Sequence, residues 1–118
     1  MQSIAPAVIE RWFTPEFRHR SPEVVAQTQQ MIESSPPEGY VACCEAIRDM
    51  DQRQAISQIR IPTLVISGTK DPVIPLAESH FLSDQIPGAH SVDLETAHLS
   101  NIEASEEFTT SIIRFLTA

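Results

Sequence analysis

Positive charge is scarce in this sequence. Its 118 residues include one lysine, Lys70, and only eight basic residues in all, against sixteen acidic ones, which gives a formal charge of −8. No run of basic residues occurs anywhere. Because a strongly acidic chain repels phosphate backbones and anionic lipid surfaces, nucleic acid and membranes are excluded as expected partners.

Cysteine is also rare, and the placement of the cysteines does not suit a disulfide framework. The only two cysteines, Cys43 and Cys44, are adjacent, so there is no framework of spaced pairs. This excludes a secreted disulfide scaffold and favours a reducing cytoplasm. No histidine or second cysteine stands at metal-ligand spacing, and we expect neither a metal site nor a cofactor. We expect both thiols to pack in the core.

Long apolar stretches are missing as well. The opening residues, MQSIAPAVIERWF, show no basic region followed by an apolar block, which argues against a signal peptide. No stretch approaches the length of a membrane span. The expected location is therefore the cytoplasm.

What remains is a globular composition with two different patterns along the chain. Residues 1–58 carry helical periodicity and no strand signal, whereas residues 59–118 alternate strand and helix. The second part predicts strands at residues 61–67 and 90–95, each followed by a helix, the last opening with a capping box at SNIE, residues 100–103. We predict an α/β fold: a helical segment, residues 1–58, followed by a βαβα unit of a parallel sheet, residues 59–118. The apolar first strand predicts sheet neighbours that the chain does not contain.

An acid and a histidine stand at matching positions in this unit. Asp71 follows the first strand and His98 follows the second. Loops that leave the carboxyl ends of neighbouring parallel strands meet at one edge of the sheet, where chemistry gathers in α/β folds. We expect Asp71 to hold His98 as an orienting acid holds a general base. The alternatives are that Asp71 only starts a turn and that His98 is a solvated loop residue.

The segments "LVISGTKDPVIP" and "AHLSNIE" resemble the acid and histidine segments of the α/β-hydrolase fold. More narrowly, "ERWFTPEF", "GYVACCEAIRDMDQR" and "TAHLSNIE" resemble the 3-oxoadipate enol-lactonases of the β-ketoadipate pathway of aromatic catabolism. The resemblance implies that Asp71 and His98 are the acid and base of a catalytic triad. It also implies that residues 1–58 form a cap over a small-molecule lactone or ester substrate. Trp12 either contacts this substrate or is a packing aromatic.

The sequence departs from the family pattern in one major respect. A nucleophile elbow, G-x-S-x-G, requires two glycines four residues apart, and the only glycines are Gly39, Gly68 and Gly88. We therefore expect the C-terminal part of an enol-lactonase-like hydrolase that is inactive alone. Its expected partners are a complementary N-terminal half or a second copy of itself. The arginines Arg11, Arg18 and Arg20 are either substrate-carboxylate ligands or solvated surface residues.

Two other interpretations stay open. In the first, the chain is part of a different α/β-hydrolase, such as an esterase, a haloperoxidase or an acyltransferase, with the same acid and histidine. Alternatively, it is a non-catalytic association module that uses its unpaired strand edge and apolar helices.

Overall fold

The computed structural model describes residues 1–118 and contains seven α-helices, one 3₁₀ helix and two strands. The first half holds α1 (Ala5–Trp12), α2 (Pro15–Arg20), α3 (Pro22–Ser34), α4 (Pro37–Asp49) and the 3₁₀ helix η1 (Ile56–Gln58). The second half holds β1 (Leu64–Gly68), α5 (Leu76–Gln85), β2 (His90–Leu94), α6 (Ser100–Glu103) and α7 (Ser105–Thr117). All helices of the first half precede both strands, as the sequence predicts.

Prolines set the starts of the first four helices. Each of these helices has a proline at one of its first two positions. Proline suits this place because the first turn leaves its N–H groups without intrahelical acceptors and its fixed φ is already helical. At α2 a second device is added, since the Thr14 hydroxyl accepts the Phe17 N–H at 3.2 Å.

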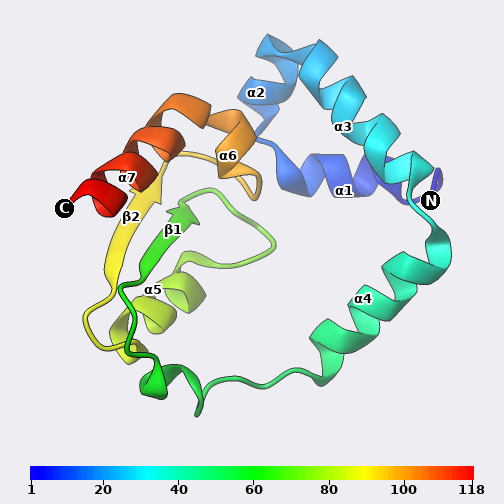
Figure 1. Cartoon of the computed structure of the whole chain (residues 1–118). Helices are drawn as coiled ribbons and strands as arrows, with labels where there is room; N and C mark the ends of the chain where they lie inside the picture. Colours follow the sequence, from blue (N-terminus) through cyan, green and yellow to red (C-terminus); the bar gives the residue numbers. More distant parts are fainter.

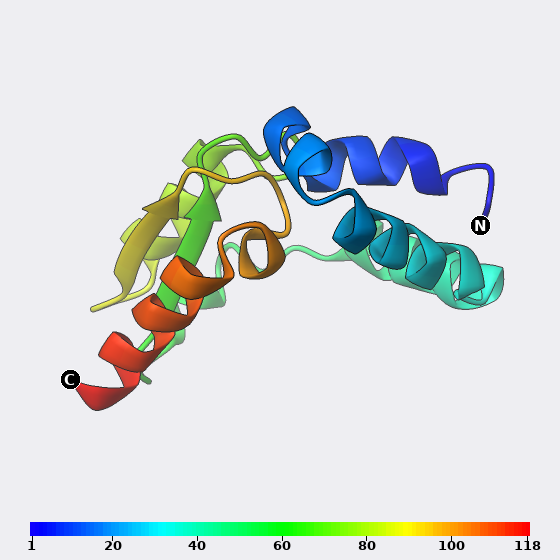
Figure 2. The same cartoon turned by 90° about the horizontal axis from the view of Figure 1, so that it is seen from above.

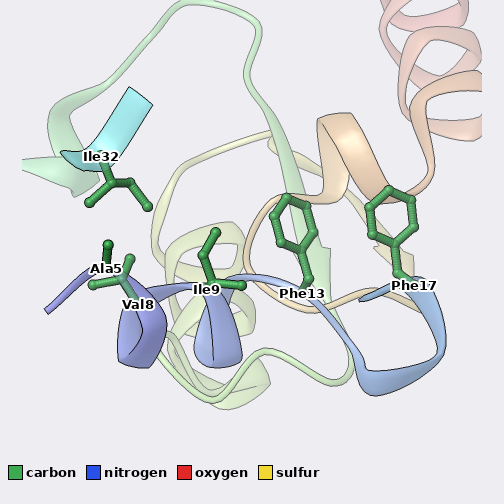
Figure 3. Close-up of a cluster of buried hydrophobic side chains, with 6 residues drawn as sticks. All are labelled: Ala5, Val8, Ile9, Phe13, Phe17 and Ile32. Carbon is green, nitrogen blue, oxygen red and sulfur yellow. The ribbon is translucent and has the colours of Figure 1, made fainter. Parts of the chain in front are cut away.

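The hydrophobic core lies among α1, α2 and α3. Figure 3 shows Ile32 of α3 facing Ala5, Val8 and Ile9 of α1. The rings of Phe13 and Phe17 stack beside them, with centroids 5.1 Å apart. Leu99 and Ile102, from the second half of the chain, also pack against this cluster. The helical segment is therefore attached to the segment that carries His98.

The two strands form a parallel sheet. Leu64 pairs with His90 and Gly68 with Leu94, and α5 makes the crossover between the strands. Figure 2 shows α5 and α7 on opposite faces of this sheet, and Figure 1 shows α4 standing away from it. The parallel strands place the ends of β1 and β2 at the same edge. The predicted α/β class and parallel arrangement are confirmed.

The molecule has much more open surface than a closed domain of its size. Its accessible area is 8234 Å², whereas a folded monomer of this mass exposes about 6,400 Å². Its radius of gyration is 15.8 Å, against about 13.5 Å for a compact domain of this length. One edge of β1 is unpaired, and the apolar strand residues Leu64, Val65 and Ile66 are only half-buried.

The expectation that Cys43 and Cys44 pack in a core is wrong. Both thiols are free and exposed, and α4 has no buried residue. Ile47, on the same helix, is 68% exposed. The helix has the apolar residues that a core position requires, but the rest of the chain buries none of them.

Some predicted boundaries also differ. The first strand begins at Leu64, not at residue 61; Pro62, just before it, has no N–H to offer a neighbouring strand. The predicted capping box does not form, because Leu99 occupies the N-cap of α6 and makes no side-chain cap bond. The closing helix is interrupted at Ala104, whose φ of −130° and ψ of 55° separate α6 from α7.

No helix of this structure has the length and apolar character that crossing a membrane requires.

Candidate functional site

Asp71 and His98 are brought together at the sheet edge where both strands end. His98 Nδ1 lies 2.9 Å from Asp71 Oδ2, which is hydrogen-bond distance. The Asp71 side chain is 8% exposed and that of His98 is 30% exposed. His98 Nε2 has no hydrogen-bond partner within the chain, so it is free to take or give a proton.

Backbone contacts fix the loop that carries the acid. Immediately before Asp71, the N–H groups of Thr69 and Lys70 donate to the carbonyls of Leu94 and Thr96, at 2.8 and 3.0 Å. The second carboxylate oxygen, Oδ1, accepts the N–H groups of Val73 and Ile74 at 2.7 and 3.1 Å. The turn that Asp71 starts and the contact with His98 therefore use different oxygens of one carboxylate. Both interpretations of Asp71 from the sequence describe part of its geometry.

Gly68 lets the histidine segment cross close to the end of β1. A Cβ at this position would lie 2.3 Å from the Ala97 carbonyl oxygen and 2.5 Å from that of Thr96. No side chain fits there without moving the backbone. The absence of a Cβ at residue 68 is thus a condition for the position of residues 96–98.

Trp12 lies beside the histidine. The Trp12 and His98 rings have centroids 6.2 Å apart and planes tilted by 32°. The Trp12 carbonyl also accepts the Leu99 N–H at 3.1 Å. Of the predicted site residues, Asp71, His98 and Trp12 therefore form one group.

Glu103 bonds to residues next to this group, Thr14 and Ala97, and the sequence did not reveal these contacts. Its Oε2 accepts the N–H groups of Ala97 at 3.2 Å and Thr14 at 3.3 Å. Its Oε1 accepts the Thr14 hydroxyl. The SNIE motif correctly marks a helix start, but the Glu103 side chain bonds to residues outside that helix. The available signal was only an acid five residues after the histidine.

The three candidate arginines differ in their surroundings. Arg11 is exposed and its Nε donates to the Ala7 carbonyl at 3.3 Å. The Arg20 guanidinium lies 5.4 Å from the centroid of the Phe17 ring. Only Arg18 has a buried Nε without a hydrogen-bond partner. The interpretation as solvated surface residues therefore fits Arg11 and Arg20 better than it fits Arg18.

A second histidine–carboxylate pair was missed. His80, on α5, places Nε2 2.9 Å from Asp93 Oδ2 on β2. His80 lies within a helix, and no spacing rule in the sequence pairs it with Asp93. This pair joins a helix to a strand, and its side chains are 45% and 36% exposed, so it is more open than the pair formed by Asp71 and His98.

A hollow of about 690 Å³ lies near these groups but is not lined by Asp71 or His98. Its lining includes Thr14, Lys70, Thr96 and Glu103, together with the two acidic side chains at the start of α7. The pair formed by Asp71 and His98 therefore lies outside this hollow. No hydroxyl or thiol of the chain hydrogen-bonds to His98 Nε2, so the histidine contacts a carboxylate and no candidate nucleophile.

Known proteins resemble this chain over most of its length. The family model described as the alpha/beta hydrolase fold matches residues 5–105. The 3-oxoadipate enol-lactonase 2 of Acinetobacter baylyi is 40% identical over 105 residues, which are 89% of this chain and 39% of that protein.

Solved structures extend the comparison. The enol-lactonase from Burkholderia xenovorans matches with a TM-score of 0.98 and 40% identity, covering 100% of this chain and 45% of that one. A hydrolase from Pseudomonas aeruginosa matches with a TM-score of 0.94 and 32% identity, covering 100% of this chain and 44% of that one. The chain thus spans less than half the length of these relatives. On the sequence match and the shared architecture, the chain belongs to the alpha/beta hydrolase fold family.

Proposed function

We propose that this chain supplies the acid and base of an enol-lactone hydrolase of the β-ketoadipate type, acting in the cytoplasm. The carrying observation is the 2.9 Å bond from His98 Nδ1 to Asp71, with Nε2 left unpartnered. Identity of 40% to an enol-lactonase supports the substrate class. Trp12, beside the histidine ring, is the proposed substrate contact from the helical cap formed by residues 1–58.

The proposed chemistry is acyl transfer to water. A serine hydroxyl attacks the lactone carbonyl while His98 Nε2 accepts its proton. His98 then protonates the departing enolate oxygen and later activates the water that releases the acid. Asp71 keeps Nδ1 protonated and stabilises the imidazolium throughout.

The serine must come from residues outside these 118. The proposed source is the N-terminal half of an α/β-hydrolase, docked against the unpaired edge of β1 and the bare apolar face of α4. The accessible area, about 1,800 Å² greater than that of a closed monomer, fits a missing neighbour of this kind.

The test is a fusion enzyme. It joins the part of the Burkholderia xenovorans enol-lactonase that lies outside the structural match to residues 1–118 of this chain. We expect the fusion enzyme to hydrolyse 3-oxoadipate enol-lactone and the isolated chain to be inactive. His98→Ala should lower kcat of the fusion by several orders of magnitude.

His80→Gln is the matched control, because it removes the other carboxylate-paired histidine and should leave kcat within about twofold. Equal losses for His98→Ala and His80→Gln would contradict the assignment. A panel of simple esters and acyl donors, run on the same fusion, separates an enol-lactonase from an esterase, a haloperoxidase or an acyltransferase.

One observation favours a second candidate, an association module. The same open surface and free strand edge are available to a second copy of the chain. Light scattering of the isolated chain distinguishes the two functions when combined with the kinetics. A defined dimer, together with an inactive fusion enzyme, would favour association over catalysis.

A further inference from the structure

Glu103 makes an unusual set of contacts for a residue at the end of a four-residue helix. One carboxylate accepts three donors: the Ala97 N–H, the Thr14 N–H and the Thr14 hydroxyl. Ala97 is 3% exposed and Thr14 is 6% exposed. Their N–H groups have little access to water, so these donors depend on Glu103 for an acceptor.

The backbone on both sides of His98 is anchored to the same short segment. The N–H of residue 97 reaches Thr14 through the Glu103 carboxylate, and the N–H of residue 99 donates directly to the Trp12 carbonyl at 3.1 Å. Residues 12–14 therefore hold the histidine from both neighbours. Hydrogen bonds to a carboxylate are stronger than those between neutral groups.

We propose that Glu103 is a positioning residue: it holds the backbone that carries His98 in register with Asp71 and couples that backbone to the Trp12 segment. The proposal rests on the proposed function for its catalytic consequence, but its structural part stands on contacts alone. Glu103 acts through the chain and does not touch the imidazole.

Helix capping does not account for these contacts. A capping box would have Glu103 accept the N–H of its own N-cap residue. The N-cap of α6 is Leu99, and the Leu99 N–H donates to Trp12 instead. The carboxylate bonds only to residues that precede the helix, one of them 89 positions away in sequence.

The first arm of the test is NMR of the isotopically labelled 118-residue chain. The signal is the downfield proton of His98 Nδ1, which reports the bond to Asp71. Glu103→Ala should shift or broaden this resonance, whereas Glu103→Gln, which keeps one acceptor oxygen, should retain most of it. Glu106→Gln is the control, because it removes a neighbouring acid of α7 that has no side-chain bond.

The second arm is kinetics of the fusion enzyme. A displacement of about 1 Å at a catalytic group costs on the order of 100-fold, and we expect Glu103→Ala to lower kcat by about 10- to 100-fold with KM changed less than about threefold. The Glu103→Gln fusion enzyme should keep most of the kcat of the parent fusion enzyme. Thr14→Val alone should lower kcat by less than Glu103→Ala does. In a Thr14→Val background, Glu103→Gln should have a smaller effect on kcat, because the Thr14 hydroxyl and Glu103 share one hydrogen bond.

The arms separate the two proposals. If the parent fusion enzyme is inactive, the proposed function is contradicted. If Glu103→Ala still shifts the His98 resonance of the isolated chain, the positioning role remains supported. Glu103→Ala could instead unfold at a lower urea concentration while the His98 resonance and kcat stay unchanged. That result would show that Glu103 contributes only to stability. If Glu103→Ala does not fold, an unchanged His98 resonance together with an unchanged kcat in Thr14→Val overturns the proposal.

Discussion

Gly68 lies directly against the carbonyl of Ala97, so closely that a Cβ on residue 68 would stand 2.3 Å from that oxygen. Gly68→Ala must push the histidine segment outward or distort β1. We expect the variant to lower the free energy of unfolding of the fusion enzyme by about 2 to 4 kcal/mol and to reduce kcat. Urea unfolding and steady-state kinetics measure the two effects.

Gly39→Ala is the matched control for that substitution. Gly39 lies within α4, and a Cβ there meets nothing within 4 Å. Because alanine favours helix over glycine, this variant should be neutral or more stable by up to about 1 kcal/mol. Equal destabilisation by both variants would show that close approach to Ala97 is not the cause.

Asp71→Asn should preserve the conformation of the loop and abolish most of the catalytic activity. The asparagine oxygen still accepts the Val73 and Ile74 N–H groups that Asp71 Oδ1 binds. Its amide NH₂ then faces His98 Nδ1 and selects the tautomer with the proton on Nε2, which cannot act as a base. We expect kcat of the fusion enzyme to fall by about 10⁴-fold. A value within tenfold of the parent would contradict the role of Asp71.

The thiols of Cys43 and Cys44 should react readily in the isolated chain. Both are exposed and free, and no residue of their helix is buried. Titration with Ellman's reagent should give two equivalents without denaturant, and Cys43→Ser and Cys44→Ser assign each phase. In the fusion enzyme we expect slower reaction, since the proposed N-terminal half covers α4. Thiols that need denaturant in the isolated chain would contradict the exposure.

Asp51 should titrate well below an ordinary aspartate. Its side-chain bonds from Arg53, the shorter at 2.5 Å, and the Arg53 backbone N–H lower the pKa of Asp51 to about 2. Any resulting stabilisation is present above the unfolded-state pKa of about 3.9 and is lost as the pH falls through about 2. Arg53→Gln should raise this pKa toward 3.9 in a carboxyl NMR titration. Arg48→Gln, which removes the partner of Asp49, should leave Asp51 unchanged.

Much of the fold follows from local patterns. The prolines and the change from helical to alternating periodicity locate the helices and strands to within a few residues, because they act on neighbouring backbone. The order of strand, Asp71, helix, strand and His98 was enough to predict that the two loops meet, since parallel strands end at one edge of a sheet.

Other features depend on distant contacts. Cys43 and Ile47 have core-like character, but burial requires an opposing surface, and the 118 residues provide none. The contact between His80 and Asp93 depends on how α5 lies over β2. Neither outcome is encoded in the spacing of the residues themselves.

The sequence by itself determined the βαβα order and the placement of an acid and a histidine after successive strands, because periodicity and turn chemistry are local properties. Only the tertiary structure decided that Glu103 bonds to Thr14 and Ala97, and that Gly68 makes room for residues 96–98. Hydrogen bonds and close approaches between residues far apart in sequence form only once the helices and strands have packed, so no local pattern specifies them.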